Sequence, residues 1–82
     1  MKDVISHYSS KDFYLVAVCL SAGCKLKSLE KSVGNFVWFV LEESPSICQE
    51  IIDKHWSGEL MVQSRKLIES INEIKTRLHS LI

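Results

Sequence analysis

The sequence predicts one small α+β domain in which a helix, two strands and two helices follow one another and an antiparallel β-hairpin packs on the helices. A dense aromatic and β-branched stretch follows a glycine-containing turn, and apolar residues recur at helical spacing in the second half. The 82 residues, 46% hydrophobic and 24% charged, have the composition of a globular domain. The expected domain covers residues 1–82, of which 1–8 can form a flexible N-terminal arm.

The first helix is expected between two local signals. Ser9 and Asp12 form a capping pair, and Gly23 stands where a left-handed helix end falls. Val16 and Val18 favour a strand locally, but a run of about eleven residues is long for a strand. Because the segment is apolar nearly all round, we expect it to be the central, most buried helix.

Two strands are expected next. The segment 24–31 alternates at first and slips phase at Leu29, which predicts a strand with a bulge near Ser28. Residues 33–35 contain Gly and Asn and predict a turn into the segment 36–41, which is aromatic and β-branched. The two strands are therefore expected to form a hairpin.

The second strand is apolar on both of its faces. Side chains alternate across a strand, so one face normally meets solvent. Either helices cover both faces, or one face docks a second chain, because a two-stranded sheet is marginal alone and leaves its edges open. One face carries Val37, Phe39 and Leu41, and the other carries Phe36, Trp38 and Val40.

The second half predicts two helices. Ser44 is a good N-cap with Pro45 at the first helical position, and Gly58 ends this helix. Its apolar stripe is Ile47, Cys48, Ile51, Ile52 and Trp56.

Ser64 is expected to cap the last helix, whose apolar residues are spaced four, three, four and three. These residues are Leu67, Ile71, Ile74, Leu78 and Leu81. Two heptads are few for a free-standing coiled coil. The heptad seam is therefore expected to lie on the domain's own core, and the alternative is that it also joins a partner.

Charge is unevenly spread along the chain. Ten basic and ten acidic residues give a formal net charge of zero, which argues against a broad phosphate-neutralising face. Residues 1–31 nevertheless carry five basic and three acidic groups (+2), residues 32–62 one and five (−4), and residues 63–82 four and two (+2). A lysine patch near an aromatic side chain is one interpretation, and edge protection of the first strand is the other. The patch would comprise Lys25, Lys27, Lys31 and Lys66.

No motif specifies a reaction. His55 and Glu59 lie four apart, but Gly58 interrupts their helix and no nucleophile stands beside them. A metal site would need the fold to join Cys24 to histidines, because no paired ligand spacing occurs. We therefore expect no catalytic residue, no metal, no cofactor and no small-molecule substrate.

The cysteine pattern and the hydropathy point to a compartment. The three cysteines are odd in number, none forms a C-x-x-C pair, and two lie in apolar surroundings. The sequence shows neither a secretory signal nor a membrane-spanning stretch. We expect structural thiols in a reducing cytoplasm, and no membrane.

Short segments along the chain resemble a family of small uncharacterised domains, a domain of unknown function found in bacteria, archaea and their phages and mobile elements. The opening helix is similar over Tyr8-Ser9-Ser10-Lys11-Asp12-Phe13-Tyr14-Leu15-Val16-Ala17, and the entry into the first strand over Ala22-Gly23-Cys24-Lys25-Leu26. Further resemblance lies in Phe39-Val40-Leu41-Glu42-Glu43-Ser44-Pro45 and Trp56-Ser57-Gly58-Glu59. The resemblance spans about residues 8–81 and implies a fold and a mobile-element setting, with no catalytic residue.

The sequence thus predicts a non-enzymatic protein–protein interaction module that forms a homo-oligomer or joins a larger protein complex, as a small regulator or inhibitor. The alternative is a nucleic-acid-binding accessory protein that uses the lysines named above. The residues expected to bind a protein partner are Phe36, Trp38, Val40, Leu78 and Leu81.

Overall fold

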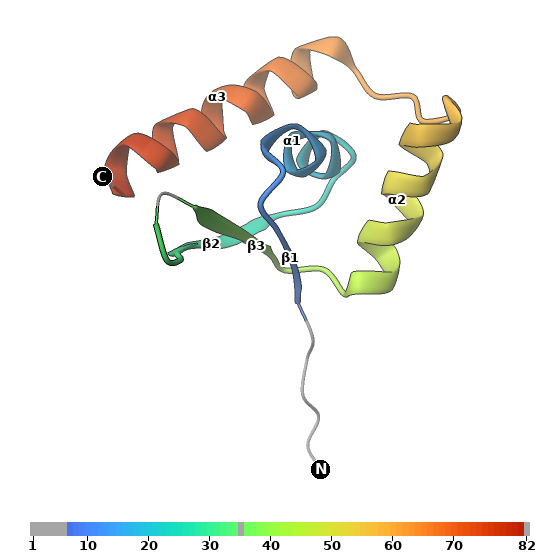
Figure 1. Ribbon diagram of the computed structural model, residues 1–82. Helices are drawn as coiled ribbons and strands as arrows, with labels where there is room; N and C mark the ends of the chain where they lie inside the picture. Colours follow the sequence, from blue (N-terminus) through green and yellow to red (C-terminus); the bar gives the residue numbers. More distant parts are fainter. Residues whose placement is uncertain (1–6, 35, 82) are drawn as a thin grey trace.

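Three helices and three strands make up the fold of the residues that the structure describes. The computed structural model describes residues 7–34 and 36–81 (Figure 1). In chain order the elements are β1 (Tyr8–Ser10), α1 (Phe13–Ser21), β2 (Leu26–Lys31), β3 (Val37–Leu41), α2 (Pro45–Ser57) and α3 (Ser64–Leu81). The α+β class and the order of the five predicted elements are confirmed, and β1 is an additional strand.

The strands form one antiparallel sheet in the order β1-β3-β2, so that the apolar strand β3 is central. The register shifts between Leu26 and Ser28, which confirms the predicted bulge. Gly34 turns the chain between β2 and β3 at φ 79°, whereas Asn35 of the predicted turn lies outside the described residues.

The short strand β1 differs from the sequence prediction. The sequence places Tyr8 at the end of a flexible arm and Ser9 in a helix cap, but Tyr8 pairs with Leu41 and Ser9 with Val40. A three-residue strand is too short to show alternation, and it forms because β3 offers it an open edge. Residues 1–6 of the predicted arm lie outside the described residues.

The helices lie on one side of the sheet. Figure 1 shows α1 over the strands, α3 beyond α1, and α2 beside β1. The prediction that α1 is the most buried helix is confirmed, because Val16, Ala17 and Cys19 have no exposed surface. The core cluster consists of Val16, Ala17, Cys19, Cys24, Leu26, Phe39, Leu41, Cys48, Ile52 and Ile74.

Local signals set the helix ends. Asp12 caps α1, since its Oδ1 accepts hydrogen bonds from the N–H groups of Tyr14 (3.0 Å) and Leu15 (3.1 Å). Gly58 ends α2 in the left-handed conformation, as predicted. Ser64, predicted as the cap of α3, is instead the first helical residue.

The heptad seam of α3 faces the domain's own core. Ile74 is fully buried, and Leu67, Ile71 and Leu78 pack against the core cluster. The seam is therefore covered within the domain, which is the first of the two interpretations offered by the sequence.

Candidate interaction face of the sheet

The sheet surface that points away from the helices is the candidate site, and we call it the outer face. Its central side chains are Trp38 and Val40, since their neighbours Phe39 and Leu41 point into the core. Val40 is only 7% exposed, yet it does not belong to the core cluster. Within residues 7–34 and 36–81, no helix crosses this face (Figure 1). The helices cover the first face of β3, whereas on the outer face Val40 is itself buried and Trp38 is half-buried.

Strand register arranges the outer face in rows. Glu30 of β2 pairs with Trp38, and the hydroxyl residues Ser28 and Ser9 flank Val40 from the two edge strands. Residues directly opposite one another in antiparallel strands share a face. Each row therefore has an apolar centre, with polar side chains at its edges.

Lys11 completes the row of Trp38 on the side of β1. Strand β1 ends at Ser10, and the following Lys11 extends over two aromatic rings. Its Nζ lies 4.5 Å from the centroid of the Phe36 ring and 4.8 Å from that of Trp38. A cation over aromatic faces at these distances is attracted by the ring quadrupole. The position of Lys11 over these rings depends on the pairing of β1 with β3, which the sequence did not predict.

A third row lies beyond Val40. The backbone N–H of Glu42 donates to the carbonyl of Lys25 at 2.9 Å, and the ring Nδ1 of His7 lies 3.1 Å from the carbonyl oxygen of Glu42. A basic side chain therefore flanks Glu42 on the β2 side, and an imidazole flanks it on the β1 side.

The predicted interaction residues fall in two places. Trp38 and Val40 lie on the outer face, and Phe36, which is 58% exposed, lies at its end. Leu78 packs against the core and Leu81 is half-buried at the end of α3, so neither lies on the outer face. Phe36 and Leu78 both line a shallow hollow of about 230 Å³.

The four predicted nucleic-acid lysines are exposed but separated. Lys25, Lys27 and Lys31 lie in or next to β2, whereas Lys66 lies near the start of α3. Acidic groups are interleaved with them: Glu30 lies in β2, and the Glu43 carboxylate accepts a hydrogen bond from the Lys25 N–H at 3.1 Å. Lys31 pairs with Val37, which packs against the core, whereas Lys25 neighbours Glu42 in the row beyond Val40, so the strand register does not gather the four lysines on one face.

The three cysteines converge in the core from α1, the turn after α1, and α2. All are buried free thiols, and all belong to the core cluster. Burial, with smaller contributions from the neighbouring thiols, raises the pKa of Cys19 to about 11, of Cys24 to about 12 and of Cys48 to about 11. Such thiols stay protonated and unreactive at neutral pH.

The described residues do not form a candidate metal centre. Among the described residues, no group of three or more His, Cys, Asp or Glu side chains is arranged to hold a metal ion. Burial, followed by the nearby Cys48 thiol and the Glu43 carboxylate, raises the pKa of the Cys24 thiol. None of the helices described is long and apolar enough to cross a membrane.

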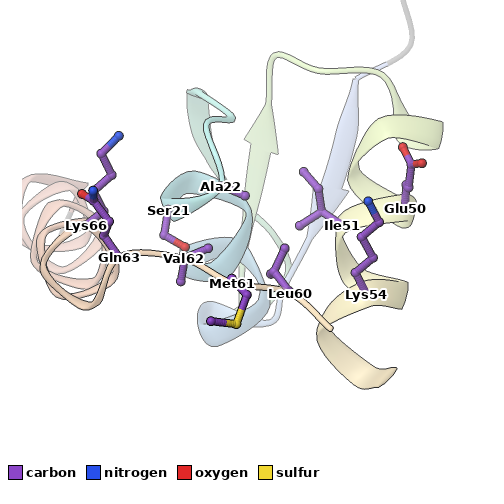
Figure 2. A pocket seen from close by; sticks show the side chains of 10 residues that line it. All are labelled: Ser21, Ala22, Glu50, Ile51, Lys54, Leu60, Met61, Val62, Gln63 and Lys66. Atoms are coloured by element: carbon purple, nitrogen blue, oxygen red, sulfur yellow. The ribbon is translucent and has the colours of Figure 1, made fainter. Parts of the chain in front are cut away.

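A shallow hollow of about 400 Å³ lies where the end of α1, α2 and the connector before α3 meet. Figure 2 shows apolar side chains such as Ile51 and Leu60 along it, with Lys66 at one end and Lys54 at the other. The ammonium groups do not converge on a common point (Figure 2). This hollow therefore lacks the clustered polar groups of a catalytic site.

Comparisons with protein-family models, with curated proteins and with solved structures found no match to this chain. The resemblance to the uncharacterised domain family consequently stays a prediction.

Proposed function

We propose that this protein is a non-enzymatic interaction module that binds a protein partner through the outer face of its sheet and self-associates. The observation that carries the proposal is the face of β3 that no described helix crosses, where the exposed Phe36 adjoins the half-buried Trp38. Aromatic side chains supply most of the binding energy in many protein interfaces. A domain of 82 residues needs most of its apolar surface for its own core, and a small binding face is compatible with that size.

The biological setting belongs to the same proposal. The family resemblance supports a small regulator or inhibitor in a phage or mobile element. Three protonated, unpaired thiols are compatible with a reducing cytoplasm, where we place the protein.

The test is the molar mass of the native chain as a function of concentration, measured by light scattering. We expect mass to rise towards that of a dimer at high micromolar concentration. Trp38→Ser should shift this rise to higher concentration by at least about tenfold, because an aromatic anchor contributes about 2 kcal/mol or more. Trp56→Ser is the matched control, since Trp56 is 70% exposed on α2, away from the outer face.

A chain that stays monomeric at all concentrations would remove self-association from the proposal. Equal effects of the two tryptophan substitutions would remove the outer face as the binding surface. Circular dichroism of each variant shows whether it is folded, and Phe36→Ser offers a second probe at an exposed position.

A nucleic-acid accessory protein is the second candidate. It is supported by Trp38 and Phe36 on a sheet face with Lys11 over them and Lys27 on the adjacent strand, since single strands stack their bases on aromatic side chains flanked by basic groups. The interleaved acidic groups favour the protein partner. A mobility shift at low salt that weakens on Lys27→Glu would favour nucleic acid, and no shift with single- or double-stranded probes would remove this candidate.

A further inference from the structure

We infer that the free edge of β2 binds an extended acidic segment of a partner protein, which joins the sheet as a further strand. This surface lies at the side of the sheet and is separate from the outer face. The inference therefore goes beyond the proposed function, and the two can hold or fail independently.

Strand β2 forms one edge of the sheet. It is the last strand in the order β1-β3-β2, and within residues 7–34 and 36–81 no other backbone segment hydrogen-bonds to its far side. Helix α3 passes close to the start of β2, where Leu26 lines a hollow of about 290 Å³ with Arg77. An edge strand is a template for pairing with another extended chain, and we place this pairing along residues 27–31.

The register shows which backbone groups of β2 are free to pair. Opposite residues of antiparallel strands alternate between hydrogen-bonded and non-hydrogen-bonded pairs. The Ser32 N–H donates to the Phe36 carbonyl at 3.0 Å, so these two residues form a hydrogen-bonded pair. Lys31 and Leu29, one and three residues earlier, therefore occupy non-hydrogen-bonded pairs with β3. Their N–H and C=O groups point away from β3, towards the free edge.

The side chains along this edge select the charge of the added strand. Lys27 and Lys31 are exposed, and between them Leu29 is half-buried and packs against the core cluster. Glu30 lies on the outer face, opposite Trp38. Each side chain of an added strand lies beside the β2 residue with which it pairs. The best match has acidic residues opposite the two lysines, an apolar residue opposite Leu29 and an uncharged residue opposite Glu30.

A second copy of β2 does not meet this requirement. In an antiparallel pair related by a two-fold axis, the axis passes between a residue and its own equivalent. An axis at Leu29 places Lys27 opposite the partner's Lys31, an axis at Glu30 opposes two glutamates, and an axis at Lys31 opposes two lysines. Like charges directly opposite one another destabilise a strand pair. The lysines thus protect the edge against self-pairing and leave it open to an acidic strand.

A synthetic peptide tests the edge. The probe is Ac-Thr-Glu-Thr-Val-Thr-Glu-Thr-NH2, whose residue pattern is the same in both directions and so fits either strand orientation. Amide hydrogen exchange of the native chain is followed by NMR. In the free protein the N–H groups of Leu29 and Lys31 should exchange faster than that of Glu30, which is bonded to β3. Peptide at about ten times its dissociation constant should slow both by about tenfold, because exchange then requires peptide release.

Two altered peptides separate the sources of affinity. A peptide with Lys in place of both Glu residues should bind at least about tenfold more weakly, because like charges then face Lys27 and Lys31. The acidic peptide N-methylated at its three central residues cannot donate to the edge and should not protect the Leu29 and Lys31 amides.

Matched variants of the protein test the charge and the location. Lys31→Glu should weaken binding of the acidic peptide by about fivefold. Lys54→Glu is the control and should leave it unchanged, because Lys54 is exposed on α2, which contacts β1 at the other edge of the sheet. Trp38→Ser should also leave it unchanged, since Trp38 lies on the outer face.

The outcomes decide the inference. Protection of the Leu29 and Lys31 amides by the acidic peptide, lost on N-methylation, supports strand addition. Binding that leaves these amides unprotected, equal binding of the Glu and Lys peptides, or no binding at millimolar peptide overturns it. The three peptides act on the native chain, so the result stands even where a variant fails to fold. Self-association is measured separately by light scattering, and its failure would leave this inference standing.

Discussion

Lys11 and Trp38 are far apart in the sequence, yet the Lys11 Nζ lies 4.8 Å from the centroid of the Trp38 ring. The contact exists because β1 pairs with the same strand that carries Trp38 and ends just before Lys11. It anchors the chain between β1 and α1 to the outer face of the sheet.

This contact should be measurable as a coupling free energy. In a double-mutant cycle with Lys11→Met and Trp38→Leu, we expect the unfolding free energies to be non-additive by about 0.5 to 1 kcal/mol, as for an exposed cation over an aromatic ring. Urea unfolding of the four proteins, at a concentration where they are monomeric, gives the value. A second cycle with Lys75→Met in place of Lys11→Met should be additive, and equal couplings in the two cycles would refute the interaction.

Asp12 and Ser44, which directly precede α1 and α2, should differ in their contribution to stability. The Asp12 carboxylate accepts two backbone N–H groups at the start of α1, so Asp12→Ala should lower the free energy of unfolding by about 1 kcal/mol. Ser44 precedes α2 without a side-chain cap hydrogen bond, so Ser44→Ala should change it by less than about 0.5 kcal/mol. Chemical denaturation of the two variants checks this, and a larger loss for Ser44→Ala would contradict the structure.

The docking of α3 on the core can be tested at two isoleucines of the same helix. Ile74 is fully buried, and Ile74→Ala should destabilise the monomer by about 2 to 5 kcal/mol because it leaves a cavity. Ile68 is 58% exposed, and Ile68→Ala should cost less than about 1 kcal/mol. Thermal unfolding compares them. Similar losses at both positions would mean that α3 is not packed through its seam as described.

The buried thiols should make stability depend on alkaline pH. Their native pKa values of about 11 to 12 exceed the value of 9.0 for an unperturbed thiol, so the native state holds its protons more tightly than the unfolded chain. This contribution is fully present below about pH 9 and is lost as pH rises towards the native pKa. Burial raises the pKa of Tyr8 in the same direction.

Urea unfolding between about pH 8 and pH 11 should therefore show a free energy of unfolding that falls as pH rises. The fall should be shallower in Cys48→Ala, which has one fewer thiol to ionise.

A thiol reagent at neutral pH should modify the native chain only as fast as the chain unfolds. Rapid labelling of the native protein, or parallel pH curves for the two proteins, would contradict the burial of the cluster.

Much of the fold could be predicted because its signals are local. Gly58 can adopt a left-handed conformation and Pro45 suits the first turn of a helix, and both act on their own neighbours. The spacing of Leu67, Ile71 and Ile74 likewise shows one apolar side of a helix before any partner is known. Such signals need only a few consecutive residues.

The candidate site could be predicted only in part. The apolar character of both faces of β3 predicts Trp38 and Val40 as interaction residues, and this remains a prediction. The strand pattern alone does not show which of the two faces the helices cover. The sequence predicts Leu78 as an interface residue, but the structure packs it against the core, because an apolar seam has the same pattern whether its own core or another chain covers it. The contact of Lys11 with both Phe36 and Trp38 depends on the pairing of β1 with β3, which no local sequence pattern indicates.

The sequence by itself determined the α+β class, the order of five elements and the ends of α2, because periodicity, proline and glycine act over short stretches of chain. Only the tertiary structure decided that β1 joins the sheet, that the helices leave one face of β3 open, and that Cys19, Cys24 and Cys48 meet in the core. These features arise from contacts between residues distant in the chain, and such contacts form only when the whole domain packs.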